Sequence, residues 1–455
     1  MMMEESKNTY RVYIESLGCA KNQVDAEVLL TYLAENGWTK TEELSQADLV
    51  LVNTCGFIES ARQESIDTFF QLHDAKPDAK FIVTGCLSQR YAETLRDDLP
   101  EADGIFGNHD LSQIVPLVQK VMGGLRPVER PEYPAASCER DDRVGLLNFP
   151  GSAYVKISEG CNHRCRYCAI PLIRGDLRSR PEAAILAEAE RLVAAGIKEL
   201  NLIAQDLAAY GTDGPDHTSK FCRLLENIAA IEGDFVVRLL YIHPDAFPQE
   251  LPALIASNPK ILPYFDIPFQ HAAVPVLRGM GRAGDRETYL KLIRSIRETL
   301  PEAVIRSTIM LGFPGEDRAA FEELMAFIDE ARLDWVGSFL YSREEDTPAW
   351  KMRTARDHKK AAKEASEWQK ELQTAQERIT AQRLQRFVGN TYDVLIEEAV
   401  EGEDLAIGRM YAQAPDVDGL TVVMGRNLVP GSRVRCGVMK VNGVDLQAIP
   451  CMETR

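Results

Sequence analysis

The sequence predicts an α/β protein of three parts: an open, doubly wound parallel sheet, a partial barrel of six strand–helix units, and a small C-terminal β-barrel. Apolar runs alternate with helical stretches over residues 10–122, and a second series of the same kind begins at Gly151. Short strand-like segments separated by turns then fill residues 388–455. A chain of 455 residues suits about three domains, at roughly 100–200 residues each.

The front domain is predicted over residues 8–123. Strands are expected at 10–15, 48–53 and 80–84, and residues 22–35 carry apolar side chains at helical spacing. Repetition of strand and helix predicts a parallel sheet whose ligand crevice lies at the carboxyl ends of the strands.

One cysteine follows each of these strands, namely Cys19, Cys55 and Cys86. A glycine lies beside each one and allows the backbone to approach a bulky ligand closely. A single cysteine in such a place is usually a small buried apolar residue. Three in equivalent positions predict a metal cluster with three protein ligands.

Residues 124–149 are predicted as a linker, because they are rich in proline and charged residues; Cys138 within them is interpreted as a bystander thiol. The core is predicted over 150–387 and ends in a long helix at 357–387. Six strands are too few for a closed eight-stranded barrel, so a partial barrel is expected. These strands are predicted at residues 154–158, 199–204, 235–241, 264–267, 304–310 and 335–341.

The most specific motif is a Cys-x₃-Cys-x₂-Cys pattern formed by Cys161, Cys165 and Cys168. Thiolates are soft ligands that suit iron–sulfur clusters and zinc, and both usually take four protein ligands. No fourth cysteine lies nearby, and His163 is poorly spaced to complete a zinc site. A 4Fe–4S cluster on three cysteines keeps one iron open for chemistry; a zinc site and a coincidental pattern are the alternatives.

The composition indicates where the protein acts, what its cysteines do and which kind of partner it binds. The chain has ten cysteines without an export signal or a run of ~18 apolar residues, so metal or redox ligands, a cytoplasmic location and no membrane segment are expected. The net charge of −17 favours a basic partner over a nucleic acid, and no DNA partner is expected. An acidic surface that only aids solubility is the simpler alternative.

The cysteine spacing, with Tyr167 just before Cys168, looks like the signature of radical S-adenosylmethionine (SAM) enzymes. Two three-cysteine sets, a flavodoxin-like front domain, a partial barrel and a small terminal β domain together resemble the radical-SAM methylthiotransferases, whose last domain is a TRAM domain. The resemblance covers essentially the whole chain.

The resemblance implies SAM and two 4Fe–4S clusters as cofactors. Cys161, Cys165 and Cys168 would be catalytic and would hold the cluster that cleaves SAM to a radical. The three front cysteines would hold an auxiliary cluster carrying the sulfur to be inserted. One SAM would methylate that sulfur, and the radical from a second would take a hydrogen atom from the substrate carbon.

Residues that bind SAM are also implied by the resemblance. They are Tyr167 in the cysteine loop, Glu199 and Gln205 on and after the second core strand, Arg306 on the fifth, and Gly312 and Pro314 in the following loop. Glu199 lies one residue late against the family's Gly-Gly-Glu segment. Lys156, Arg174 and Arg178 are candidates to bind carboxylates, with a structural role equally open.

Three features favour the protein-modifying RimO-type branch. The first motif reads Ser-Leu-Gly-Cys-Ala-Lys-Asn at residues 16–22, residues 408–419 look like the version of that branch, and residues 388–455 hold six basic against ten acidic residues. The implied substrate is the β-carbon of an aspartate in the basic ribosomal protein S-twelve, with flavodoxin or ferredoxin as electron donor. Methylthiolation of tRNA adenosine-37 and a non-catalytic, metal-stabilised RNA-binding module are the alternatives.

Overall fold

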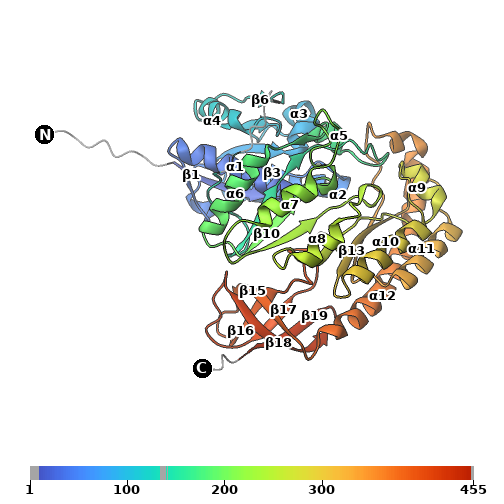
Figure 1. The fold of residues 1–455 in the computed structure, drawn as a ribbon. Coiled ribbons are helices and arrows are strands. Elements are labelled where there is room, and N and C mark those ends of the chain that lie inside the picture. The colour runs from blue at the N-terminus through green and yellow to red at the C-terminus, as the bar shows by residue number, and fades with distance from the viewer. Residues whose placement is uncertain (1–9, 134–139, 141, 452–455) are drawn as a thin grey trace. The chain divides into compact units, whose positions relative to one another are not determined.

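The computed structural model describes residues 10–133, 140 and 142–451 (Figure 1), and Cys138 lies outside these residues. The chain forms two compact units. The first contains the described residues up to Leu147 together with 159–162 and 169–184, and the second contains the rest. Within the described residues, no helix is long and apolar enough to cross a membrane.

The front sheet has six parallel strands in the order β2-β1-β3-β4-β5-β6. This is the flavodoxin-like order with one added edge strand, so the strand order reverses between β1 and β3. The predicted doubly wound sheet is thus confirmed. Its strands are β1 (Arg11–Ser16), β2 (Thr39–Lys40), β3 (Leu49–Thr54), β4 (Lys80–Gly85), β5 (Gly104–Phe106) and β6 (Val128–Glu129).

Helices cover both faces of this sheet, and the central strand β3 shows why. Leu49 and Leu51 pack into one buried core, whereas Val50 and Val52 pack into the other. Alternate strand residues point to opposite faces, so a strand covered on both sides is a continuous apolar run. The helices are α1 (Ala20–Glu35), α2 (Glu59–Ala75), α3 (Cys86–Asp98) and α4 (Ile114–Met122).

Much of the predicted linker 124–149 packs on the front domain. It contributes the edge strand β6, and Arg143 forms a buried ion pair with Glu27 of α1. The backbone N–H of Leu147 donates to the same carboxylate at 2.9 Å. Backbone pairing and a buried charge pair therefore hold a segment whose composition indicated a free connection.

The partial barrel is confirmed with six parallel strands in two groups, β11-β10-β7 and β12-β13-β14. The groups are joined where the N–H of Ile242 donates to the carbonyl of Asp266 at 2.9 Å. The strands are β7 (Ser152–Lys156), β10 (Glu199–Ile203), β11 (Val236–Leu240), β12 (Tyr264–Asp266), β13 (Val304–Leu311) and β14 (Trp335–Leu340).

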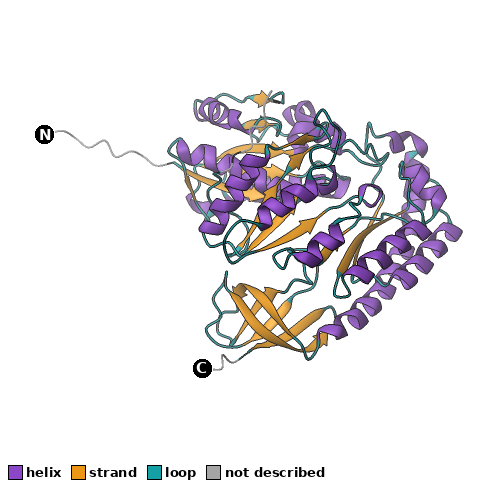
Figure 2. Cartoon of the chain, viewed as in Figure 1, coloured by secondary structure: helices purple, strands orange, loops and turns teal. Residues whose placement is uncertain are grey.

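The segments between these strands are largely helical (Figure 2). The long helix α12 (Ala355–Leu384) matches the predicted one within two or three residues and packs on β14, and its Trp368 stacks on Phe321 at 5.2 Å. Short strands β8 (Ser158–Glu159) and β9 (Arg178–Ser179) flank the cysteine loop in sequence. The other helices are α5 (Ile170–Arg174), α6 (Glu182–Ala194), α7 (Phe221–Ala229), α8 (Leu251–Ser257), α9 (Val274–Met280), α10 (Arg286–Thr299) and α11 (Arg318–Ala331).

The C-terminal segment forms a closed five-stranded barrel in the order β15-β16-β17-β19-β18, as predicted. Its interior is filled by buried apolar side chains that include Val394, Ile396 and Leu446. Closure leaves no unpaired sheet edge, which makes so small a β domain viable. Its strands are β15 (Thr391–Ala399), β16 (Leu405–Arg409), β17 (Thr421–Met424), β18 (Arg433–Asn442) and β19 (Asp445–Pro450).

The segment 409–418 of this small barrel closes the amino-terminal end of the partial barrel. The indole N–H of Trp335, at the start of β14, donates to the carbonyl of Ala412 at 2.7 Å. The hydroxyl of Tyr264, at the start of β12, donates to Asp418 at 2.5 Å. Because both partners begin strands, the segment lies against the end opposite to the strands' carboxyl edge.

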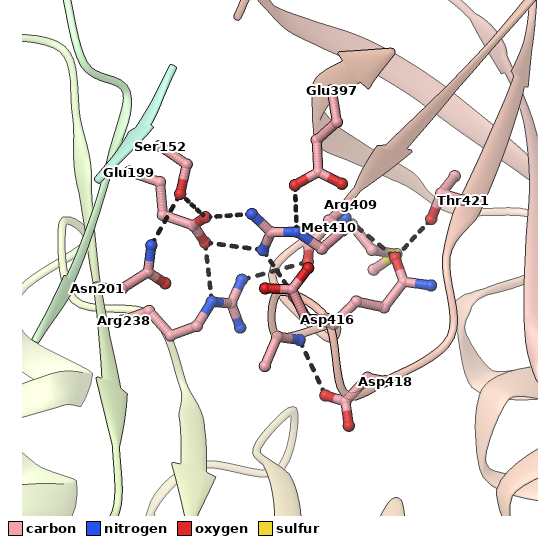
Figure 3. Close-up of polar contacts among 12 residues, drawn as sticks. Ser152, Glu199, Asn201, Arg238, Glu397, Arg409, Met410, Asp416, Asp418 and Thr421 are labelled. Carbon is pink, nitrogen blue, oxygen red and sulfur yellow. Dashed lines mark hydrogen bonds and ion pairs between the residues drawn. The ribbon is translucent and has the colours of Figure 1, made fainter. Parts of the chain in front are cut away.

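A buried network of four charges strengthens this closure (Figure 3). Glu199, the first residue of β10, accepts from Arg409 at 2.6 Å and from Arg238 at 2.8 Å, and Arg409 also donates to Glu397 at 2.6 Å. Burial raises the pKa of Glu199, but the two guanidiniums outweigh it and hold that pKa at about 2. Two positive and two negative charges compensate one another, so burying them is tolerable.

Removing one partner of this network should strongly destabilise the second unit. We expect Glu199→Gln to lower the free energy of unfolding by about 3–5 kcal/mol, because Arg409 and Arg238 lose a buried counter-charge. The unfolding midpoint in urea measures this loss. Arg426→Gln is the control, since its pair with Asp404 is exposed and such pairs contribute about 0–1 kcal/mol. Equal midpoints for the two variants would contradict the prediction.

The carboxyl of Asp418 is buried at the same closure. It accepts from Tyr264 and from the N–H of Ala414, and it lies 3.3 Å from Arg306. Burial raises its pKa to about 6, and the attraction of Arg306 offsets that shift only in part. The folded state therefore binds a proton more tightly here than the unfolded chain does.

This carboxyl should give the fold a measurable pH dependence. A raised acid pKa means that stability is lost as the pH rises from about 4 to about 6, by up to about 3 kcal/mol. Asp418→Asn keeps a hydrogen-bond acceptor but cannot ionise. We expect its midpoint relative to the parent to improve as the pH rises through that window. A difference between the two proteins that does not change with pH would contradict this expectation.

Candidate active site

The front cysteines follow three neighbouring strands at the carboxyl edge of the front sheet. Cys19 precedes α1, Cys55 follows β3, and Cys86 is the first residue of α3. Cys19 and Cys55 thus flank the point where the strand order reverses, which is where such sheets bind ligands. Their thiols range from exposed at Cys19, through half-buried at Cys55, to buried at Cys86.

The cysteine loops pack against one another so closely that side chains are excluded. Gly18 has φ +97°, and a Cβ there would lie 3.0 Å from the Cβ of Cys55. A Cβ on Gly56 would lie 2.6 Å from the backbone of Cys86. Real Cβ atoms do not approach backbone so closely, so glycine is needed for these loops to meet.

Asn22, the last residue of the first motif, ties the three loops together. Its buried amide nitrogen donates to the carbonyls of Leu17 at 3.0 Å and Thr54 at 2.9 Å. The amide oxygen thereby faces Cys86, whose thiol donates to it at 3.2 Å. One side chain therefore contacts segments next to all three cysteines, which sequence reasoning did not foresee.

Two features near these thiols stabilise negative charge, although burial acts against them. The N-termini of α1 and α3 lie at the cysteines, and a helix N-terminus stabilises negative charge. Burial raises the pKa of the Cys86 thiol to about 12, while the adjacent Arg174 guanidinium lowers it. Thiolate ligands are deprotonated, so a buried cation beside Cys86 suits a bound metal cluster.

The second set lies in the loop that begins shortly after β7. The N–H of Cys168 donates to the carbonyl of Cys165 at 3.0 Å, and Arg164 between the cysteines has φ +54°. All three cysteines of this loop are half-buried. Cys161 belongs to the first unit, and the other two belong to the second, so the loop connects the two units in sequence.

Four predicted SAM-binding residues lie at the carboxyl edge of the partial barrel, where barrel enzymes keep their chemistry. Gln205 follows β10, and Gly312 and Pro314 follow β13. Tyr167 meets the ring of Phe313 edge-on at 6.5 Å, so the cysteine loop and the loop after β13 are in contact. Their SAM contacts stay predictions.

The two other predicted SAM-binding residues lie elsewhere. Glu199 begins β10 at the amino end of the sheet, and Arg238 and Arg409 already bind its carboxylate. Arg306 donates to Asp266 at 3.1 Å and lies 3.3 Å from Asp418 of the C-terminal barrel. Both residues bind the segment that closes the amino end, so a role in binding SAM does not fit this structure.

Polar side chains that bind one another lie beside the second cysteine set. The buried Arg282 donates to the hydroxyl of Tyr167 at 3.2 Å and interacts electrostatically with Cys165. The ring of His163 lies 2.6 Å from Asp206 and stacks on His243 at 3.9 Å. The sequence offered His163 only as a poorly spaced zinc ligand, and nothing in it pairs this residue with Asp206.

The residues present fit two iron–sulfur groups by their chemistry. Each set offers three soft thiolates and a nearby buried arginine, Arg174 or Arg282, whose positive charge offsets an anionic cluster. Within the described part of the chain, no three His, Cys, Asp or Glu side chains are close enough together to hold one metal ion.

Family models match three successive parts of the chain. They are "Uncharacterized protein family UPF0004" over residues 11–107, "Radical SAM superfamily" over 155–328 and "TRAM domain" over 388–450. These ranges follow the front domain, the partial barrel and the C-terminal barrel in order.

Solved structures share the fold at low sequence identity. The radical S-adenosylmethionine methyltransferase TsrM from Kitasatospora setae matches with a TM-score of 0.55 and 18% identity over 75% of this chain and 77% of that one. The cobalamin-dependent S-adenosylmethionine radical enzyme OxsB matches with a TM-score of 0.51 and 12% identity over 78% and 56%. At this identity the likeness supports the arrangement of elements alone.

Curated relatives are much more similar. Proteins named "Ribosomal protein uS12 methylthiotransferase RimO" are 42% identical in Treponema denticola, over 95% of this chain and 99% of the relative, and 42% identical in Syntrophotalea carbinolica, over 92% of each. The Geobacter sulfurreducens protein of the same name is 39% identical over 96% and 97%. The chain therefore belongs to the RimO family of radical-SAM methylthiotransferases.

Proposed function

We propose that this enzyme transfers a methylthio group to the β-carbon of an aspartate in ribosomal protein uS12. The observation that carries the proposal is the similarity along nearly the whole chain to relatives named for action on uS12. The similarity extends over the front sheet, the partial barrel and the C-terminal barrel.

The proposal assigns two 4Fe–4S centres. Cys19, Cys55 and Cys86 would hold one, and Cys161, Cys165 and Cys168 would hold the other. When bound, these centres and SAM supply sulfur, methyl and radical chemistry that no amino-acid side chain offers. The chain itself would contribute thiolate ligands and positive charge near them.

The residues at that edge would position SAM. Gln205, Gly312 and Pro314 would line its site, and Tyr167 would be held beside it by Arg282. The amino end of the barrel is closed by residues 409–418, so substrate and cofactor would enter from the carboxyl edge. A flavodoxin or ferredoxin would supply electrons.

Charge supports a basic protein as substrate. The chain carries −17, and the end of β15 together with the following turn exposes Glu398, Glu401, Glu403 and Asp404. Acidic surface attracts a basic partner and repels phosphates. Residues 408–419, which looked typical of the protein-modifying branch, use Asp416 and Asp418 for contacts within the chain.

The proposed substrate is tested by incubating the reduced, reconstituted enzyme with SAM and either uS12 or tRNA. We expect uS12 to gain the mass of one methylthio group in place of a hydrogen, on a peptide in which fragmentation assigns the change to an aspartate. uS12 with that aspartate replaced by alanine is the matched control. Modified tRNA with unmodified uS12 would favour the alternative, methylthiolation of adenosine-37, and refute the proposal.

The proposed cofactor content is tested by iron analysis of the reconstituted chain. About eight irons per chain are expected, falling to about four in Cys55→Ala or Cys86→Ala and also in Cys165→Ala, because each substitution removes one of the three ligands that hold a cluster. Cys222→Ala is the control, since this free cysteine of α7 belongs to neither set. Unchanged iron in the Cys55 and Cys86 variants would eliminate the front centre.

A further inference from the structure

Arg174, at the end of α5, is buried beside one of the front cysteines. Its side chain is 3% exposed and reaches four acceptors. One terminal nitrogen (Nη1) donates to Asp25 at 2.7 Å and to Glu159 at 2.8 Å. The other (Nη2) donates to Asn22 at 2.6 Å and to the sulfur of Cys86 at 3.1 Å.

Each terminal nitrogen of Arg174 binds a different kind of acceptor, which charge attraction alone would not require. The carboxylates take Nη1, which leaves Nη2 for the amide oxygen and the thiol. The planar guanidinium fixes both directions at once. Asn22 cannot turn its oxygen away, because its nitrogen is bound to Leu17 and Thr54. The N–H···S contact is therefore held in place by its surroundings.

The positive charge of Arg174 is also needed to compensate the negative groups around Cys86. Two carboxylates lie against it in a buried site, so without the guanidinium a thiolate on Cys86 would face uncompensated negative charge. Reduction of an iron–sulfur cluster adds a further electron to that region. Hydrogen bonds to the cluster's sulfurs, nearby charge and solvent exposure set its reduction potential.

We propose that Arg174 is a positioning residue for the front centre: its guanidinium orients the Cys86 thiolate and raises the reduction potential of the cluster bound there. This inference rests on the proposed function, which places a 4Fe–4S cluster on Cys19, Cys55 and Cys86. A charge-assisted N–H···S bond draws electron density from the thiolate, and the fixed positive charge stabilises the reduced cluster.

The test uses the full-length chain with Cys161, Cys165 and Cys168 replaced by alanine, so that signals come from the front centre alone. Iron content and the midpoint potential, from a redox titration followed by electron paramagnetic resonance, are measured for this parent and for Arg174→Gln and Arg174→Lys. We expect a more negative midpoint in Arg174→Gln and a smaller shift of the same sign in Arg174→Lys, which keeps the charge but loses the fork of donors.

Arg126→Gln is the matched control. Arg126 lies in the same unit and donates only to backbone carbonyls in the contacts resolved for it, such as that of Leu99 at 2.8 Å. Its loss should leave the midpoint unchanged. If Arg174→Gln fails to retain iron, the midpoint potential of Arg174→Lys is compared with that of the parent. Equal potentials in these two proteins would overturn the inference.

The outcomes separate this inference from the function on which it rests. A parent that binds about four irons and variants that keep its midpoint would refute the role of Arg174 and leave the front centre intact. A parent that binds no iron would refute the front centre itself. A negative shift confined to the Arg174 variants would support the inference.

Discussion

All parallel strands of a sheet end at the same edge, and both cysteine sets depend on this constraint. In the front sheet it brings Cys19, Cys55 and Cys86 to one edge, although 67 residues separate the first from the last. In the partial barrel it places the cysteine loop, Gln205 and the loop after β13 at one edge. Contacts between loops, such as that of Asn22 with Thr54 and Cys86, then add to the strand pairing.

The amino-terminal end of the partial barrel stabilises the second unit. A segment of the C-terminal barrel closes it, and Glu199, Arg238, Glu397 and Arg409 compensate one another's charges there (Figure 3). Such a network adds little stability over apolar packing, but removing one partner is costly because it leaves a buried charge uncompensated. The C-terminal barrel is thus part of the core structure of the second unit.

Buried arginines accompany several of the negative groups that this chain buries. Arg174 faces Cys86, Arg282 interacts with Cys165, and Arg409 joins two carboxylates. The guanidinium is always charged and offers several directed donors, so it can serve acceptors of different kinds at once. The net charge of −17 does not reveal these local positive charges, each of which compensates negative groups at one buried site.

The sequence by itself determined the three-part architecture and the grouping of the cysteines. Alternating apolar runs specify strands, and residues that directly follow parallel strands must share an edge. Asn22 stands in a recognisable motif, yet its role in linking three loops emerged only from the fold. Tertiary structure alone decided the partners of Glu199 and Arg306, since a strand's pattern does not reveal what covers its amino end. Arg174 meets Asp25 across 149 residues and Arg409 meets Glu199 across 210, and no local periodicity encodes contacts so distant.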